Sequence, residues 1–239
     1  MIFRQLFEPD TCTYTYLLAC ETSQKAILID TVAIEFEHYI KLLDELNLEL
    51  VYTLETHVHA DHVTCASLLR DHLGSKSMVH RDAGAMCADL LVTDGIGFHV
   101  GSIEIKILHT PGHTSGCVSY LVNDRVFTGD SLLINGCGRT DFQQGDSATM
   151  YQSVTEKLFA LPADTLVYPG HDYTGKRVSC IAQEKDLNPR LGQQKTVAEF
   201  IEIMQNLDLP YPKYIDEALP ANQACGAAEE AHKAPLRQG

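Results

Sequence analysis

The sequence predicts one layered domain of the α/β or α+β type, and three observations support this fold class. The chain has 239 residues, 45% of them hydrophobic, which is enough for a sizeable core. Short apolar runs with strand periodicity are interspersed with segments of helical spacing. Several of these runs end in a polar residue beside a glycine, as expected where a sheet presents a site along one rim.

The N-terminal half contains patterns for both kinds of element. The apolar residues Phe36, Ile40 and Leu43 recur at helical spacing. Gly74 is a plausible C-terminal stop for a helix that comes just before it. The elements predicted for this half are strands at 13–18, 26–29 and 48–55 and helices at 34–46 and 63–73, and the first two strands should belong to one meander.

In the C-terminal half, several predicted strands are each followed by a turn and a polar residue. Ile103, Ile105 and Ile107 alternate with charged residues, which indicates a half-buried strand. The elements predicted here are strands at 103–107, 116–122, 125–128 and 165–167 and helices at 147–160, 177–186 and 196–206. We treat residues 1–239 as a single domain, in which about 207–239 form a tail that packs partly on the domain and frays from about 228.

Composition excludes several classes of partner. The net charge is −14, with scattered acidic residues, which argues against nucleic acid. No apolar run approaches the roughly 18 residues of a membrane span, so no membrane partner is expected.

The first residues resemble neither a secretory signal nor a transit peptide, so we expect a cytoplasmic location. The eight cysteines are dispersed without a C-x-x-C pair, and we expect reduced thiols.

Residues 57–62 carry the most informative motif, H-x-H-x-D-H. It directly follows an apolar strand, and imidazole nitrogen and carboxylate oxygen are both ligands for divalent metals. Further donors follow three other predicted strands, namely His113, Asp130 and His171, each directly after a glycine. A lone loop histidine is usually not a ligand, but this shared position favours a common metal site.

These residues resemble the metallo-β-lactamase superfamily and, within it, the persulfide dioxygenases, also called sulfur dioxygenases. The most specific segment is G-C-G-R-T-D-F-Q-Q-G at 136–145. The other matching segments are 56–62, 109–114, 128–130, 168–173, 187–190 and 220–222. The resemblance spans about residues 10–190 and implies an αββα sandwich of the α+β class, with the metal at the sheet rims.

The resemblance also implies the metal and its ligands. It assigns one Fe(II) per chain to His57, His113 and Asp130, a facial triad that leaves three positions open. A hydrolase of the same fold would instead use four further residues to complete two metal sites. Those residues, which in the dioxygenases resemble partners that orient the triad, are His59, Asp61, His62 and His171.

Three residues are candidates for contacts with the substrate. The guanidinium of Arg139 is suited to a carboxylate of glutathione, although an ordinary salt bridge is the simpler reading. The phenol of Tyr173 could donate a hydrogen bond to the same ligand or merely pack at the sheet edge. Cys137 lies near the expected pocket as a candidate redox thiol, with inert packing equally compatible with the sequence.

The implied activity is oxidation of glutathione persulfide by O2 and water to sulfite and glutathione. The main alternative is a glyoxalase II-like thioester hydrolase with two metals, whose C-terminal region is usually a longer helical domain than the residues after Leu187 provide. A non-catalytic redox or metal-storage protein is disfavoured because the cysteines are not clustered. The resemblance also suggests a homodimer.

Overall fold

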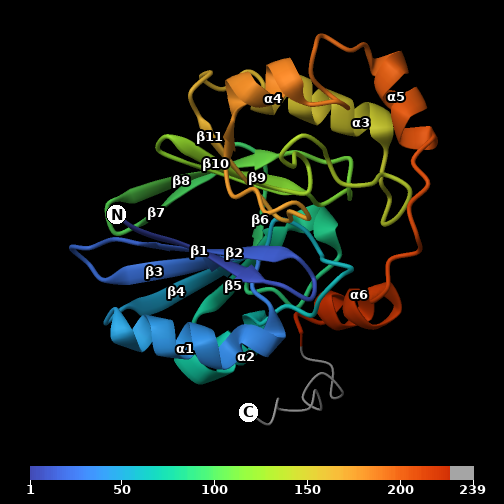
Figure 1. Ribbon diagram of the computed structural model, residues 1–239. Coiled ribbons are helices and arrows are strands. Elements are labelled where there is room, and N and C mark those ends of the chain that lie inside the picture. Colours follow the sequence, from blue (N-terminus) through green and yellow to red (C-terminus); the bar gives the residue numbers. More distant parts are fainter. Residues whose placement is uncertain (227–239) are drawn as a thin grey trace.

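The computed structural model describes residues 1–226 and has the predicted αββα architecture in a single domain. Two six-stranded sheets pack face to face, with α1 and α2 on the outer side of one and α3 and α4 on the outer side of the other (Figure 1). The α+β fold class predicted from the sequence is confirmed. Within residues 1–226, no helix is long and apolar enough to cross a membrane.

The first sheet has the strand order β1-β2-β3-β4-β5-β6. Its strands are β1 (Ile2–Glu8), β2 (Thr13–Ala19), β3 (Lys25–Ile29), β4 (Glu49–Leu54), β5 (Lys76–His80) and β6 (Leu90–Val92). The β1-β2-β3 part is antiparallel, which confirms the predicted meander, and β3 to β6 pair in parallel.

The second sheet has the strand order β12-β11-β10-β9-β8-β7. Its strands are β7 (Gly97–Val100), β8 (Ile103–His109), β9 (Val118–Val122), β10 (Arg125–Gly129), β11 (Leu166–Pro169) and β12 (Ser179–Cys180). Only β10 and β11 pair in parallel, so their carboxyl ends, which carry Asp130 and His171, meet at one edge.

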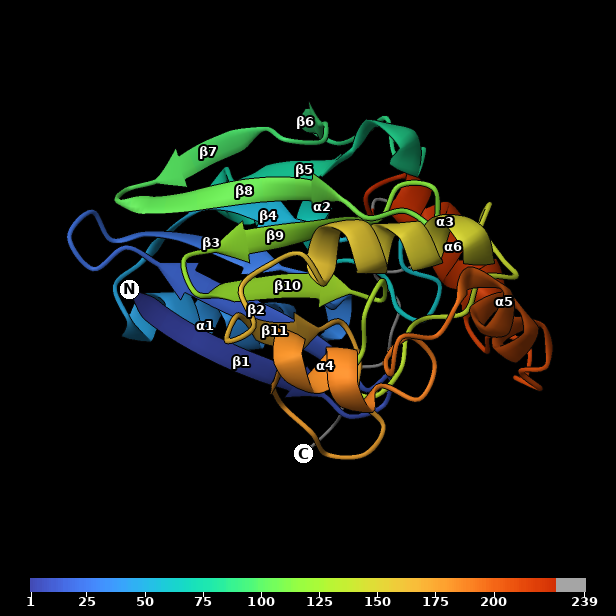
Figure 2. The same ribbon diagram turned by 90° about the horizontal axis from the view of Figure 1, so that it is seen from above.

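Six α-helices complete the described part of the chain, and Figure 2 shows α3 and α4 lying across the second sheet. They are α1 (Phe36–Glu45), α2 (Ala66–Leu73), α3 (Ser147–Gln152), α4 (Ile181–Leu187), α5 (Val197–Gln205) and α6 (Ile215–Gln223). Helix α3 continues as a π-helical turn over Ser153–Leu158. Helix α4 begins at 181 and not at 177, because Ser179 and Cys180 pair with β11.

The alternation of β2 divides the core into layers. Tyr16 and Leu18 point into the cluster between the sheets, whereas Leu17 and Ala19 join the cluster under α1 and α2. All four are buried to 1% exposure or less. A strand buried on both faces is a rigid support, so the loops at its end of the sheet are held in fixed positions.

The expectation that all eight cysteines are reduced is wrong for two of them. Cys87 and Cys225 form a disulfide, 138 residues apart in sequence. Helix α6 brings Cys225 to the loop before β6, and no local spacing in the sequence reveals that contact. The other six cysteines are free. The predicted fraying from about 228 lies outside the described residues.

Candidate metal centre

The H-x-H-x-D-H motif forms an irregular loop between β4 and α2, which we call the metal loop (residues 57–64). His57, His59 and His62 are only 2%, 1% and 5% exposed. The helix predicted over 63–73 begins at 66, because the Thr64 backbone N–H donates to Asn222 Oδ1 at 2.8 Å and does not follow the helical pattern. The loop is therefore held by contacts with remote parts of the chain.

Three possible metal ligands from three separate segments of the chain converge here. His57 lies in the metal loop, His113 in the loop after β8, and Asp130 directly after β10. One ligand atom from each lies within 4.8 Å of the others. Gly112 permits this approach, because a Cβ atom there would lie 2.3 Å from the Met150 Cα. We call His57, His113 and Asp130 the triad.

Each triad histidine is oriented by a partner on its outer nitrogen. The Thr56 hydroxyl donates to Asp30 and so accepts from His57 Nδ1, at 3.0 Å. His113 Nδ1 donates to the Arg139 carbonyl oxygen at 2.7 Å. These bonds leave Nε2 of both rings with a free lone pair. Burial, with His59 and His113 nearby, holds the pKa of His57 well below its usual value, which keeps that lone pair available.

Asp130 is oriented by His171, which bridges two carboxylates. His171 Nδ1 bonds Asp130 Oδ1 at 2.7 Å, and Nε2 bonds Asp61 Oδ2 at 2.9 Å. Burial opposes the charged imidazolium, but the two carboxylates raise the pKa of His171 well above its usual value. Burial also disfavours the Asp130 carboxylate, yet His171 and the triad histidines hold the pKa of Asp130 well below its usual range. Asp130 is therefore ionised, as a ligand must be.

A second group of possible ligands, which we call the loop group, consists of His59, Asp61 and His62. Asp61 Oδ2 contacts His62 Nδ1 at 2.7 Å in addition to His171. His59 Nε2 lies 3.2 Å from Asp30 Oδ1. Burial lowers the pKa of His59, but Asp30, Glu55 and Asp61 together outweigh burial and raise it to about 10. These ligand atoms are thus paired mainly with other protein groups.

The triad fits a divalent transition metal. Two imidazole nitrogens and one carboxylate oxygen form a mixed donor set, each oriented by a separate outer partner. In the loop group, His59 Nδ1 and His62 Nε2 have no hydrogen-bond partner among residues 1–226. The described chain therefore holds a prepared site at the triad and, beside it, two buried imidazole nitrogens without a partner.

Arg139 lies at the metal centre, but its guanidinium is already paired. Nε and Nη2 donate to the two oxygens of Asp141 at 2.6 and 2.7 Å, and Nη1 donates to the Pro210 carbonyl oxygen at 2.7 Å. The group also stacks over the Phe142 ring, 4.5 Å from its centroid. Three of its five N–H donors are used, which leaves two for a ligand.

Tyr173 and Cys137 lie on different sides of the centre. The Tyr173 ring is 71% exposed and parallel to the His171 ring, with centroids 6.1 Å apart. It is therefore placed at the solvent side of the site. Cys137 is 2% exposed and packs in the core beneath α3 and α5. Burial raises the pKa of the Cys137 thiol to about 11, which disfavours the reactive thiolate.

Sequence reasoning missed three residues that hold the centre together. Asp30 accepts hydrogen bonds from the Thr56 backbone and hydroxyl, at 2.7 and 2.8 Å. Gln143 donates to the Val58 carbonyl oxygen at 2.7 Å, and Asn222 bonds the same loop from α6. Asp30 could have been found, because it follows an apolar strand just as Asp130 does. Gln143 and Asn222 lie in the resembling segments 136–145 and 220–222, but no local pattern assigns either residue to the metal loop.

Comparison with known proteins agrees with this geometry. Residues 12–171 match the metallo-beta-lactamase superfamily. The chain is 49% identical to the human protein named persulfide dioxygenase ETHE1, mitochondrial, over 95% of this chain and 89% of the relative. A crystal structure of ETHE1 from Myxococcus xanthus has 50% identity and a TM-score of 0.93, covering 95% of this chain and all of that one. A hydroxyacylglutathione hydrolase of Pelagibacter ubique is 33% identical over 94% of this chain and 92% of its own length.

The fold and the site thus define a metal-binding enzyme of the metallo-β-lactamase class. Within that class, the chain belongs to the persulfide dioxygenase family, because its identity to those relatives extends over almost the whole of both chains.

Proposed function

We propose that this protein oxidises glutathione persulfide with O2 and water, giving glutathione, sulfite and two protons. Its similarity to the persulfide dioxygenases over 95% of the chain supports the reaction, and the lower identity to a hydroxyacylglutathione hydrolase makes hydrolysis the weaker alternative. The metal we propose is one Fe(II), held by His57, His113 and Asp130.

The observation that carries this proposal is the bridging position of His171. In a two-metal hydrolase of this fold, His171 and the loop group would hold the second ion. Here both His171 ring nitrogens bond carboxylates, and one of those carboxylates, Asp61, also bonds His62. His171 thus orients Asp130, and Asp61 and His62 in turn support His171, an arrangement that we take to favour a single metal.

The protein residues have distinct tasks in the proposed reaction. His57 and His113 would each offer Nε2 to the metal, and His171 holds one oxygen of Asp130 by a hydrogen bond. Fe(II) in such a triad supplies open positions for the persulfide sulfur and O2 and carries the change of oxidation state. The buried surroundings limit access of water to the site.

We assign the glutathione end of the substrate to Arg139 and Tyr173. The two free N–H groups of Arg139 suit a carboxylate, and Asp141 fixes the plane of the guanidinium. The backbone carbonyl of Arg139 also holds His113, so the same segment supports both the metal ligand and the substrate. We assign to Tyr173, an exposed residue whose ring lies beside that of His171, a hydrogen bond to the same ligand. A redox role for Cys137 stays a prediction.

A homodimer and a cytoplasmic location complete the proposal. The mammalian relatives carry the word mitochondrial in their names, so the location needs a direct test by fractionation of the source cells. Size-exclusion chromatography with light scattering tests the dimer.

An oxygen electrode combined with sulfite analysis tests the proposed reaction. The iron-loaded protein should consume O2 and release sulfite in about equal amounts from glutathione persulfide. Replacing iron with redox-inert zinc should abolish that activity. S-lactoylglutathione serves as the control substrate and should be almost unchanged under nitrogen. Efficient hydrolysis of the thioester, with equal activity in the zinc form, would establish the hydrolase instead.

A further inference from the structure

Helix α6 holds the metal loop through one buried amide side chain, that of Asn222. The loop has no regular secondary structure, so its backbone polar groups need partners from elsewhere. Asn222 Nδ2 donates to the carbonyl oxygens of His59 and His62 at 2.8 and 2.7 Å. Its Oδ1 accepts from the Thr64 N–H at 2.8 Å. Both amide hydrogens and the oxygen of a side chain only 4% exposed thus serve one loop.

The position of Asn222 depends on how α6 is anchored. This helix has nine residues with Pro220 inside, and a helix of that length is not stable on its own. Leu219 packs against the small cluster of Val58, Val79 and Ala85. Figure 1 shows α6 at one end of the sandwich, apart from the other helices of the first sheet. Ile215, Ala218 and Ala221 are also buried, and the segment that follows the helix adds a further anchor.

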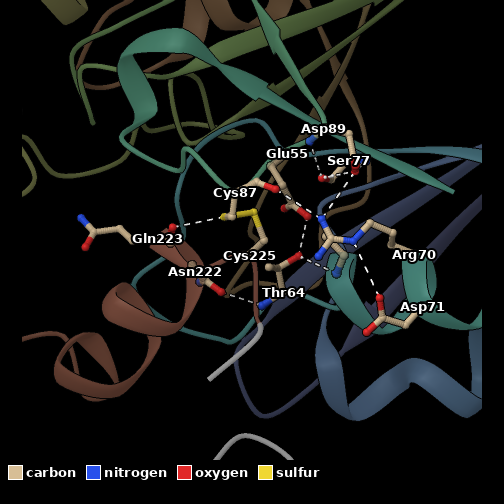
Figure 3. The surroundings of a disulfide bond; sticks show 11 residues. Glu55, Thr64, Arg70, Asp71, Ser77, Cys87, Asp89, Asn222, Gln223 and Cys225 are labelled. Carbon is tan, nitrogen blue, oxygen red and sulfur yellow. Dashed lines mark hydrogen bonds and ion pairs between the residues drawn. A yellow bond between two sulfur atoms is a disulfide. The ribbon is translucent and has the colours of Figure 1, made fainter. Parts of the chain in front are cut away.

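The disulfide supplies that anchor. Cys225, three residues after Asn222, is bonded to Cys87 in the loop before β6, close to Asn222 and Thr64 (Figure 3). The Cys225 N–H donates to the Asn222 carbonyl oxygen at 2.9 Å, and its own carbonyl oxygen accepts from the Ser67 N–H at 3.2 Å. The bond therefore ties the end of α6 to a distant part of the chain.

The two cysteine residues differ in their exposure to solvent. Cys225 is only 3% exposed, whereas Cys87 is partly exposed. An attacking thiolate can therefore reach the Cys87 sulfur and displace the buried Cys225 as the leaving group. This asymmetry makes the bond open to reduction without unfolding of the domain.

We propose that Asn222 is a positioning residue for the metal loop and that the Cys87–Cys225 disulfide is a thiol-sensitive lock on its position. A thiolate of a low-molecular-weight thiol forms a mixed disulfide with Cys87 and releases the Cys225 thiolate. A second thiol resolves the mixed disulfide, so two thiols are oxidised to one small disulfide and both cysteines become reduced. Helix α6 then loosens, the Asn222 hydrogen bonds open more often, and the metal leaves faster. The inference rests on the proposed metal site but not on the proposed substrate.

Metal release and amide exchange of the iron-loaded full chain test the lock. Alkylation under denaturing conditions followed by mass spectrometry should label six cysteines before treatment with glutathione or dithiothreitol and all eight after it. Reduction should increase the rate of iron transfer to a chelator about tenfold, as expected for loss of an outer support, and should speed hydrogen exchange at Thr64. Cys87→Ser should show the fast behaviour without reductant. Cys180→Ser, which removes a free and partly exposed cysteine, is the matched control and should behave as wild type.

A second variant tests whether the effect passes through Asn222. Asn222→Ala should release iron quickly in both redox states, with no further effect of reductant. Asn222→Asp keeps an acceptor for Thr64 but loses both donors, so it should not restore slow release. If either variant fails to fold, the comparison of Cys87→Ser with Cys180→Ser still decides. The proposal is overturned if the untreated protein already labels eight cysteines, or if opening the bond changes neither release nor exchange. These readouts need no persulfide, so they are independent of the proposed reaction.

Discussion

The triad and the loop group contain the same kinds of side chain but are supported in opposite ways. The triad comes from three separate elements, and the outer atoms of its members bond groups that are not ligands of the triad. The loop group comes from four consecutive residues; Asp61 bonds His62 and His171, whereas His59 bonds Asp30. The type of residue alone therefore does not determine whether a metal binds; the partners that hold each side chain also decide.

The strongest test of this contrast is loss of charge in the triad. Asp130→Asn keeps the size of the side chain but removes the carboxylate, so iron binding should weaken by more than the roughly 10- to 100-fold typical of losing an outer partner. Iron per chain, measured by mass spectrometry after anaerobic loading, should fall from about one to nearly none. Asp124→Asn, an exposed aspartate paired with Arg125 before β10, is the control and should keep its iron. Near-normal iron in Asp130→Asn contradicts the assignment.

The next largest effect should come from the residue that joins the two groups. His171→Gln removes the bridge between Asp130 and Asp61, so iron affinity should fall about 10- to 100-fold. The stoichiometry reached at saturating iron should stay at one per chain. If wild type binds two ions and the variant only one, His171 is a ligand of a second metal. His99→Gln, an exposed histidine in β7, provides the control.

The donors of the triad could be predicted because strand ends are marked in the sequence. The strand predicted at 48–55 is β4, Glu49–Leu54, and the loop that follows it carries His57. Asp130 likewise comes directly after β10, and its partner His171 lies two residues beyond the end of β11. A buried strand fixes the place where its chain leaves the sheet, so a local pattern determines the position of the side chain that follows.

Contacts that depend on docking of a remote segment could not be predicted. Asn222 and the Cys87–Cys225 bond reach the metal loop only because α6 returns to it, and no periodicity encodes that return. Strand β1, Ile2–Glu8, was missed because its apolar residues occur in pairs and do not alternate. A salt bridge was the alternative considered for Arg139, but its partner Asp141, only two residues away, was not identified.

Arg139 has two separable roles beside the triad residue His113. Its backbone holds the ligand, whereas we assign its side chain to the substrate, so a side-chain change should separate the two tasks. Arg139→Ala should lower kcat/KM about 10- to 100-fold, equivalent to about 1.5–3 kcal/mol for a charge-assisted bond, with iron content unchanged. Arg139→Lys should recover only part, because an ammonium lacks the planar fork. Arg125→Ala, a paired arginine of β10, is the control, and an unchanged kcat/KM in Arg139→Ala places the substrate carboxylate elsewhere.

The smallest effect should come from the loop group itself. His62 Nε2 has no hydrogen-bond partner among residues 1–226, and its Nδ1 bonds Asp61, which is two steps removed from the triad through His171. The amide of His62→Gln can still donate to Asp61, so iron affinity should fall less than about tenfold and the stoichiometry should stay at one. The loss of iron affinity should be larger in His171→Gln, because His171 bonds the ligand Asp130 directly. Titration of both apo-variants with Fe(II) under nitrogen gives the two affinities side by side. A loss in His62→Gln as large as that in Asp130→Asn would mean that the loop group binds the metal directly, and the contrast between the two groups would then be wrong.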